Sequence, residues 1–471
     1  MLTLVTPEMA TITFAKPFSP EESRRILDQL QQPLVFLNMT CDWPALSWTA
    51  QHLSDRLGDK RLRFRLGRKK DTHEPLFESQ CSYVEATLAE FLCWTVGHTP
   101  TENGPFSNYP QSDYWAYADY KYIAMLFQDQ PSMFEDVKWS DFGFEGRGGR
   151  ESTLWIGTEG ANTPCHLDSY GCNLVLQVQG RKRWHLFPPE DTAYLYPTRI
   201  PYEESSVFSQ VNVLHPDLTR LPDFSHARVH IVTLQPGQVL FVPRHWWHYV
   251  ESVDPITVSV NSWIELDCDD RARVSEAVTR TLVCAIKAAP SDDNTDVWLN
   301  PTEKEVLSHD ENMQYVNLAV RAWTERQICH KEPVHNSKAD SPPKRDSRGQ
   351  TRTNKKPNPA TFSIPYGPCL IPVRCQHEGE TRIIPEEDGS LRDFLVTSQE
   401  PCTGTTSTSE SKHEHRPVLN QSKSHDSTDR TLEDNKGAGH PTITTNDLLD
   451  CLLHPDVISC VTDLLLQRNC K

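Results

Sequence analysis

Six short segments rich in β-branched and aromatic residues follow one another between residues 153 and 264. The turn-forming pairs Pro188-Pro189 and Pro236-Gly237 stand between them, where chain reversals are expected. Short strands separated by turn residues are typical of an antiparallel sandwich or barrel, so this region predicts a mainly β core. The strands expected are residues 153–157, 173–178, 183–187, 230–234, 238–242 and 256–264.

The region before these strands predicts helices and one further strand. Residues 19–32 are expected to form a helix, because Ser19 can act as N-cap and Glu22 can complete a capping box. A short apolar strand is expected at residues 33–38. Mixed helical segments are expected after it, and they contain Trp43, Trp48, Trp94 and Trp115.

The composition changes near residue 330, where Lys, Ser, Pro and Thr replace apolar residues. This change predicts a disordered linker, and deletion of everything beyond residue 330 is expected to leave the barrel folded. The leucine-rich end is expected to form amphipathic helices that either dock on a partner or pack back on the chain. The division expected is 1–140, an N-terminal helical and strand part; 141–270, the β core; 271–330, helices that cover the core or form a homodimer; 331–440, the linker; and 441–471, the terminal helices.

Charge and cysteine content exclude several classes of protein. The 47 Lys and Arg against 64 Asp and Glu give a net charge of −17, which disfavours direct binding to nucleic acid or anionic membranes. No stretch approaches the roughly 20 apolar residues that span a bilayer, and the N-terminus does not resemble a leader. Fourteen cysteines without CxxC pairs favour reduced thiols and a cytoplasmic location, while a basic run at residues 344–356 leaves nuclear access open.

Three His-x-Asp triplets occur in the sequence, and they begin at His166, His215 and His454. Proline occupies the middle of the last two, which suits turns or helix starts. His166 and Asp168 lie two apart in an extended context, so both side chains can point to one sheet face. We therefore expect the first triplet to supply metal ligands.

A third ligand is needed to complete a two-His, one-carboxylate set. This set holds non-haem Fe(II) and leaves three coordination positions open. We predict His248, because it begins the strand after a Pro-containing corner that can return beside His166. His245 is the alternative, but it precedes two tryptophans and does not begin that strand.

Lys182 is a candidate for binding an anionic co-substrate. It shares a strand face with Trp184 and Leu186, so it points inward if they do. A buried ammonium is unfavourable unless it meets an anion, which a dicarboxylate would provide. The alternative is a surface lysine in a basic turn.

On the last strand, Asn261 and Trp263 share a polar face that points either into the cavity or to the solvent.

Several spaced motifs agree in order with one known family. They are Thr163-Pro-Cys-His-Leu-Asp168, Asn173, Gly180-Arg-Lys-Arg-Trp-His-Leu-Phe-Pro-Pro189, Pro236-Gly-Gln-Val-Leu-Phe-Val-Pro243 and Trp246-Trp-His248. Over residues 20–270 the chain resembles the JmjC family of Fe(II)/2-oxoglutarate oxygenases. It is nearest to the cupin-like branch that contains the asparaginyl hydroxylase called factor inhibiting hypoxia-inducible factor.

The resemblance implies a double-stranded β-helix with Fe(II) on His166, Asp168 and His248. It also implies that the distal carboxylate of 2-oxoglutarate binds Lys182, helped by Thr163 and by a tyrosine of the preceding helix. That tyrosine is expected to be Tyr117, with Tyr120 as the alternative. The further polar positions of the family pocket correspond to Asn173 and Asn261, although the stretch from His166 to Gly180 is one residue longer here than in the hydroxylase.

The resemblance also implies a function and a partner. Trp139-Ser-Asp-Phe-Gly-Phe144 and the leucine-rich end resemble JmjC proteins named for association with a small heat-shock protein, which implies such a partner and a role in stress. The expected function is protein hydroxylation that uses O2. The alternatives are an adaptor without turnover and, less favoured because no zinc-finger spacing is present, a lysine demethylase.

Overall fold

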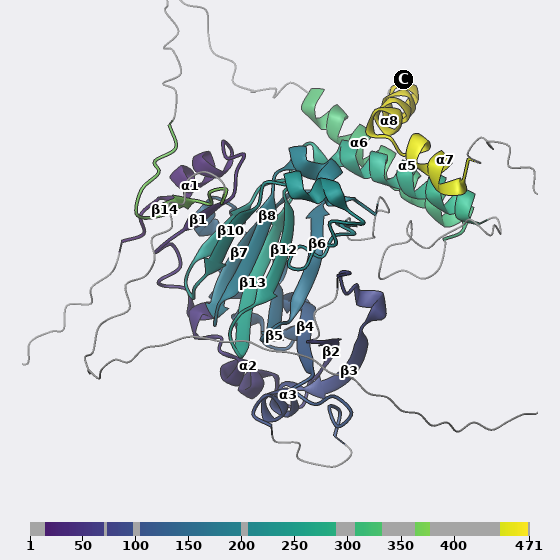
Figure 1. Ribbon diagram of the computed structural model, residues 1–471. Helices are drawn as coiled ribbons and strands as arrows, with labels where there is room; N and C mark the ends of the chain where they lie inside the picture. Colours follow the sequence, from purple (N-terminus) through teal and green to yellow (C-terminus); the bar gives the residue numbers. More distant parts are fainter. Residues whose placement is uncertain are drawn as a thin grey trace, which may run out of the picture. The chain divides into compact units, whose positions relative to one another are not determined.

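Two antiparallel sheets form the centre of the structure, a computed structural model (Figure 1). This arrangement confirms the mainly β, double-stranded β-helix fold with flanking helices. The nine-stranded sheet runs in the order β14 (Leu370–Pro372), β1 (Leu34–Phe36), β11 (Val239–Val242), β7 (Cys172–Gln179), β13 (Ile256–Ile264), β5 (Thr153–Thr158), β4 (Tyr114–Tyr122), β2 (Arg61–Arg68) and β3 (Ser82–Thr87). The five-stranded sheet runs in the order β10 (His230–Leu234), β8 (Lys182–Phe187), β12 (Trp247–Ser252), β6 (Asn162–Asp168) and β9 (Ser206–Phe208).

The structure describes residues 15–69, 73–97, 104–198, 206–288, 307–331, 363–376 and 443–469. The basic run at residues 344–356 and most of the expected linker lie outside these ranges. Within them, no helix combines the length and apolar character needed to cross a membrane.

Strand β13 separates an apolar core from a polar cavity. Val258 and Val260 are fully buried in the main core, which the helices cover on the outer face of the larger sheet. Ser259 and Asn261 point the other way and line a cavity between the two sheets. The polar face of the last expected strand is therefore its cavity side.

The expectation of mixed helical segments in this part of the chain is wrong, because β2, β3 and β4 are strands. Trp94 does lie in a helix, α3 (Leu88–Thr95), but Trp115 lies in β4. In β2, Leu62, Phe64 and Leu66 are buried in the core, and arginines separate them. This alternation has the period of two that identifies a strand, and it was the signal missed.

The N-terminal helix α1 (Pro20–Leu27) has the expected cap. Ser19 Oγ accepts a hydrogen bond from the Glu22 amide at 3.2 Å, and the Glu22 carboxylate accepts one from the Ser19 amide at 2.9 Å. The helix ends earlier than the expected residue 32. The short helices α2 (Ala50–Leu57) and α4 (Ile123–Leu126) complete this part of the fold.

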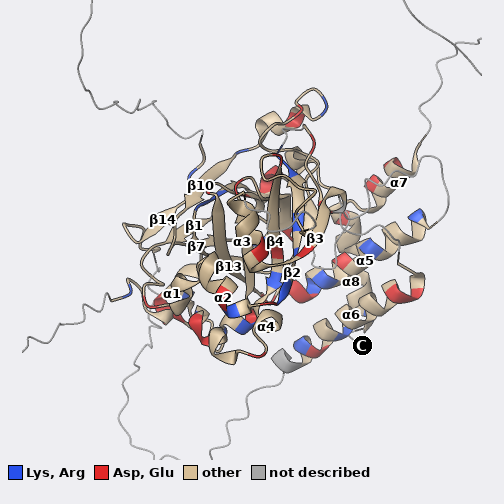
Figure 2. Cartoon of the chain, turned by 90° about the horizontal axis from the view of Figure 1, so that it is seen from below, with Lys and Arg blue, Asp and Glu red and all other residues tan. Residues whose placement is uncertain are grey.

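The C-terminal helices pack on one another. They are α5 (Asp269–Lys287), α6 (His309–Lys331), α7 (Thr445–Leu452) and α8 (Pro455–Asn469). Leu449, Leu453 and Ile458 are buried against apolar residues of α5 and α6, so the leucine-rich end packs back on its own chain. Arg271 of α5 pairs with Asp463 of α8 at 2.8 Å. Acidic and basic residues are interspersed along α5 and α6 (Figure 2).

One segment of the expected linker belongs to the larger sheet. Residues 370–372 form β14, which pairs antiparallel with β1 so that Val35 lies opposite Ile371. Leu370 is fully buried in the main core. The Pro-rich composition around it gave no sign of this pairing.

The helix packing predicts which leucines of the C-terminal end matter for stability. Replacing the fully buried Leu449 with Ala should lower the free energy of unfolding by about 2–5 kcal/mol, because it removes apolar contacts and leaves a cavity. Leu464→Ala is the matched control, because Leu464 is 55% exposed. Urea unfolding of the full chain measures both, and equal losses would contradict the packing described.

Candidate metal centre

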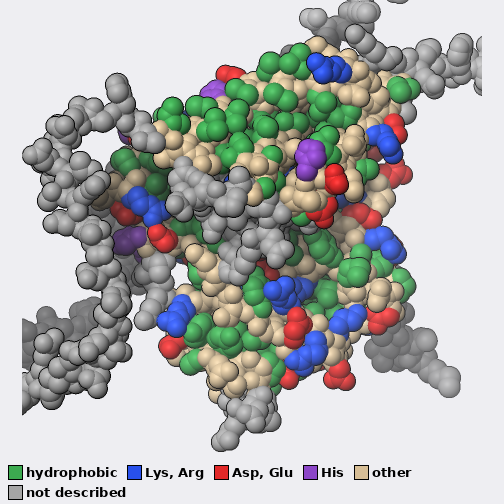
Figure 3. Space-filling model, turned by 90° about the vertical axis from the view of Figure 1, so that its right-hand side faces the viewer, with side chains coloured by type: hydrophobic (Ala, Val, Ile, Leu, Met, Phe, Trp, Pro, Cys, Tyr) green, Lys and Arg blue, Asp and Glu red, His purple; other side chains and the backbone are tan. Residues whose placement is uncertain are grey.

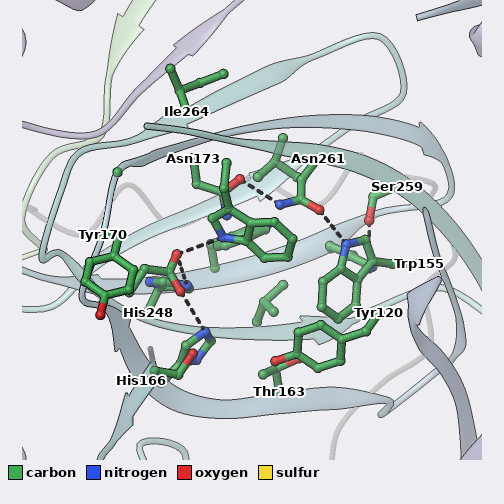
Figure 4. A pocket seen from close by; sticks show the side chains of 18 of the residues that line it. Tyr120, Trp155, Thr163, His166, Tyr170, Asn173, His248, Ser259, Asn261 and Ile264 are labelled. Carbon is green, nitrogen blue, oxygen red and sulfur yellow. Dashed lines mark hydrogen bonds and ion pairs between the residues drawn. The ribbon is translucent and has the colours of Figure 1, made fainter. Parts of the chain in front are cut away.

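His166, Asp168 and His248 meet at the boundary between β6 and β12. The two strands are antiparallel neighbours, with His248 directly opposite His166. The distance from His166 Nε2 to Asp168 Oδ1 is 3.8 Å, and from His248 Nε2 to Asp168 Oδ2 it is 3.9 Å. One ligand atom from each residue lies within 4.8 Å of the others, so the three could hold a single metal ion (Figure 4).

Backbone carbonyls orient both histidines. Nδ1 of His166 lies 2.9 Å from the Pro164 carbonyl oxygen, and Nδ1 of His248 lies 2.9 Å from that of Trp246. We assign the proton to each Nδ1, which then donates to the carbonyl and leaves Nε2 free to bind a metal. No residue type at positions 164 and 246 marks these acceptors, since they are backbone atoms.

Burial sets the protonation of the site. Desolvation lowers the pKa of His166 well below its usual value, and the neighbouring His248 lowers it further. Burial raises the pKa of Asp168, while His248 and a hydrogen bond from Trp263 oppose this rise. A neutral imidazole is the form that binds a metal, and a cation would favour the ionised carboxylate.

A chain of hydrogen bonds lines one wall of the cavity. Trp155 Nε1 donates to Asn261 Oδ1 at 2.7 Å, and Asn261 Nδ2 donates to Asn173 Oδ1 at 2.9 Å. Trp263 Nε1 donates to Asp168 Oδ2 at 3.1 Å, which orients the carboxylate. Of these residues, the sequence analysis predicted Asp168, Asn173, Asn261 and Trp263 as site residues, and it did not predict Trp155.

Lys182 lies in the same cavity and is only 2% exposed, so it is not a surface lysine. Its Nζ donates to Tyr117 Oη at 3.1 Å and to Ser259 Oγ at 2.8 Å. Thr163 lines the same cavity and opposes the rise that burial causes in the pKa of Tyr117. Burial lowers the pKa of Lys182 to about 7. An ammonium with such partners is suited to receive an anion.

Tyr117 comes from a strand and not from a helix, which corrects the expectation. It lies in β4, where the pairing with β5 changes register between Ala118 and Lys121. Within this irregularity Tyr120 has a positive φ of 51°, and its ring lies 4.6 Å from that of Trp155. The bulge therefore brings both tyrosines to the cavity wall, where Tyr117 accepts the hydrogen bond from Lys182.

The cavity has a volume of about 210 Å³, and both the three candidate metal ligands and Lys182 line it. Tyr170, Glu265 and Arg273 also line it, and the Arg273 guanidinium lies 4.5 Å from the centre of the Tyr170 ring. Sequence reasoning missed Arg273, because α5 follows the strands and carries no recognisable motif. His245 does not line the cavity, since its Nε2 lies 3.2 Å from the Ser169 carbonyl oxygen.

Residues 20–270 match the sequence profile of the Cupin-like domain, which covers more than half of the chain. The chain belongs to the Cupin-like domain family. The Cupin-like chain is 57% identical over 458 residues to "HSPB1-associated protein 1 homolog" of Danio rerio, covering 97% of this chain and 98% of that protein. It is 50% identical over 474 residues to "HSPB1-associated protein 1" of Homo sapiens, covering 96% and 94% respectively.

A more distant relative of the Cupin-like chain matches about half of each protein. It is "Lysine-specific demethylase 8" of Danio rerio, 30% identical over 239 residues, with 50% of this chain and 53% of that protein covered. These matches confirm the expected resemblance to cupin-like JmjC proteins, a superfamily that includes oxygenases.

The bond to Asp168 predicts unequal roles for two tryptophans of the cavity. Trp263→Phe should weaken metal binding about tenfold or more, because the carboxylate loses the donor that orients it. Trp184→Phe is the control, because Trp184 Nε1 has no hydrogen-bond partner among the described residues. Chelator competition measures both affinities, and an equal loss in the two variants would show that the indole bond has no such role.

Proposed function

We propose that the protein is an Fe(II)/2-oxoglutarate-dependent oxygenase that hydroxylates a protein substrate. The observation that carries this proposal is the position of Lys182 in the cavity that also contains His166, Asp168 and His248. Among the described residues its hydrogen-bond partners are neutral hydroxyls, so an incoming carboxylate would offset its charge. Membership of a family whose members use Fe(II) and 2-oxoglutarate supports the same conclusion.

Each part of the cavity has a separate task in this proposal. The three metal-binding side chains would hold Fe(II), while Lys182, Tyr117 and Thr163 would bind the distal carboxylate of 2-oxoglutarate. When bound, the metal and the co-substrate supply the oxidising chemistry with O2, with release of succinate and CO2. Trp184, Val175 and Val250 give the cavity an apolar side that limits access of water.

The partner proposed is a small heat-shock protein. The support is the name of the close relatives, which are called HSPB1-associated proteins. Apolar side chains also gather on the C-terminal helices (Figure 3), where Leu318 of α6 and Leu464 of α8 are 61% and 55% exposed. Such a surface is typical of protein–protein contacts. It supports a second candidate function, in which the protein binds its partner as an adaptor without turnover. It would equally suit a homodimer formed through these helices.

The location proposed is the cytoplasm. In support, every cysteine whose state the structure describes is free, as expected in a reducing compartment. Demethylation of lysine remains the least supported activity, since the demethylase match covers only half of this chain.

Turnover of 2-oxoglutarate tests the proposed activity. We expect the iron-loaded protein to release succinate after O2 is added, and a small heat-shock protein that is a substrate should increase the rate. Asp168→Ala supplies the blank, because it removes the carboxylate ligand. Binding of the heat-shock protein with succinate release no greater than the blank would support the adaptor instead.

The pH dependence of co-substrate binding tests the role of Lys182. Because the pKa of Lys182 in the free protein is about 7, the ammonium predominates below this pH and is lost above it. Affinity for 2-oxoglutarate should therefore be highest below pH 7 and should fall by up to about tenfold for each pH unit above it. Calorimetric titration between pH 6 and 9 measures this.

Lys182→Met is the control for this titration. It should bind weakly at every pH and should show no such fall, because it has no titrating amine. An affinity of the unaltered protein that stays constant from pH 6 to 9 would contradict the role given to Lys182.

A further inference from the structure

Arg65 of β2 is a charged side chain buried completely beside the Lys182 end of the cavity. Its Nε donates to Asp119 Oδ2 at 2.6 Å, and its Nη2 donates to the Asn162 carbonyl oxygen at 2.8 Å. The guanidinium carbon also lies 5.7 Å from the centre of the Tyr117 ring. Nothing in the metal centre itself requires this arginine.

The two acceptors of Arg65 belong to different sheets. Asp119 lies in β4 of the nine-stranded sheet, two residues after Tyr117. Asn162 lies in β6 of the five-stranded sheet, immediately before Thr163. One planar guanidinium therefore joins the two strands that carry Tyr117 and Thr163, the hydroxyl side chains proposed to bind the distal carboxylate with Lys182, and the fork of an arginine suits two such acceptors in fixed geometry.

The carboxylate that Arg65 holds also acts on Lys182. The negative charge of Asp119 raises the pKa of the Lys182 ammonium, in opposition to burial. A second carboxylate, Glu78, faces the same guanidinium, and burial raises its pKa to about 7. The position of Asp119 thus affects both the geometry and the charge of the anion-binding end.

We propose that Arg65 is a positioning residue for the co-substrate: it sets the spacing between Tyr117 and Thr163, and so the affinity for the distal carboxylate of 2-oxoglutarate. The inference rests on the proposed function. It assigns Arg65 no contact with the co-substrate and no part in metal binding.

Variants of two arginines on one strand test the proposal. Arg65→Met should raise the Kd and the KM for 2-oxoglutarate about tenfold or more, because the two hydroxyls lose their common support. The kcat at saturating 2-oxoglutarate and the metal affinity should stay within about threefold of the unaltered protein, because the metal ligands are untouched. Arg65→Lys, which keeps the charge but loses the fork, should give an intermediate value.

Arg63→Met is the matched control. Arg63 lies on the exposed side of β2 with its guanidinium 3.8 Å from the centre of the Tyr83 ring. Its loss should leave the affinity for 2-oxoglutarate within about twofold of the unaltered protein, as expected for a surface change. If Arg65→Met does not fold by circular dichroism, Arg65→Lys and Asp119→Asn decide, since both keep the volume of the buried pair nearly unchanged.

The outcomes separate this role from the function on which it rests. If the metal-loaded unaltered protein does not bind 2-oxoglutarate, the proposed function fails and this role fails with it. If the unaltered protein binds 2-oxoglutarate and the folded Arg65 and Asp119 variants bind it equally well, only this role is overturned. Equal losses of metal affinity and co-substrate affinity would also overturn it, because they indicate a general structural effect.

Discussion

The antiparallel register between β6 and β12 is the constraint on which the site depends. It places His248 opposite His166 and leaves Asp168 two residues further along the same strand face. A shift of one residue would turn one of the ligands away from the others, because side chains alternate along a strand. The carbonyls of Pro164 and Trp246 then direct both Nε2 atoms inward. The ligand set is therefore a property of strand pairing more than of any flexible loop.

Burial disfavours the charged form of the ionisable side chain at each end of the cavity. At one end, burial raises the pKa of the Asp168 carboxyl, and at the other it lowers the pKa of the Lys182 amine. Each charged form is disfavoured without a ligand, and opposite charges would favour both. A cation at the first end and an anion at the second would therefore bind to a site that is already in place. This complementarity links the polar lining of the cavity to the chemistry proposed for it.

The sequence analysis predicted those parts of the site that depend on short-range patterns of residues. The spacing of His166 and Asp168 and the strand face shared by Lys182 and Trp184 follow from a period of two, and the structure places both pairs in the cavity. Arg65 lay beyond such reasoning, because its acceptors are a side chain 54 residues away and a backbone carbonyl 97 residues away. The pairing of β14 with β1 joins residues still further apart in the chain, such as Val35 and Ile371, and local composition does not encode it.

The left-handed backbone of Tyr120 has a consequence for sequence change over time. A residue with a Cβ in this region carries an energetic cost of roughly 1–2 kcal/mol, which glycine avoids. Selection for stability alone would therefore favour glycine or asparagine at this position. A cupin-like descendant that no longer used its cavity would be free to make that change, whereas one that needs the aromatic wall beside Trp155 would keep the tyrosine. Related sequences that retain the activity should therefore keep tyrosine at position 120, whereas those that have lost it should more often have glycine or asparagine there.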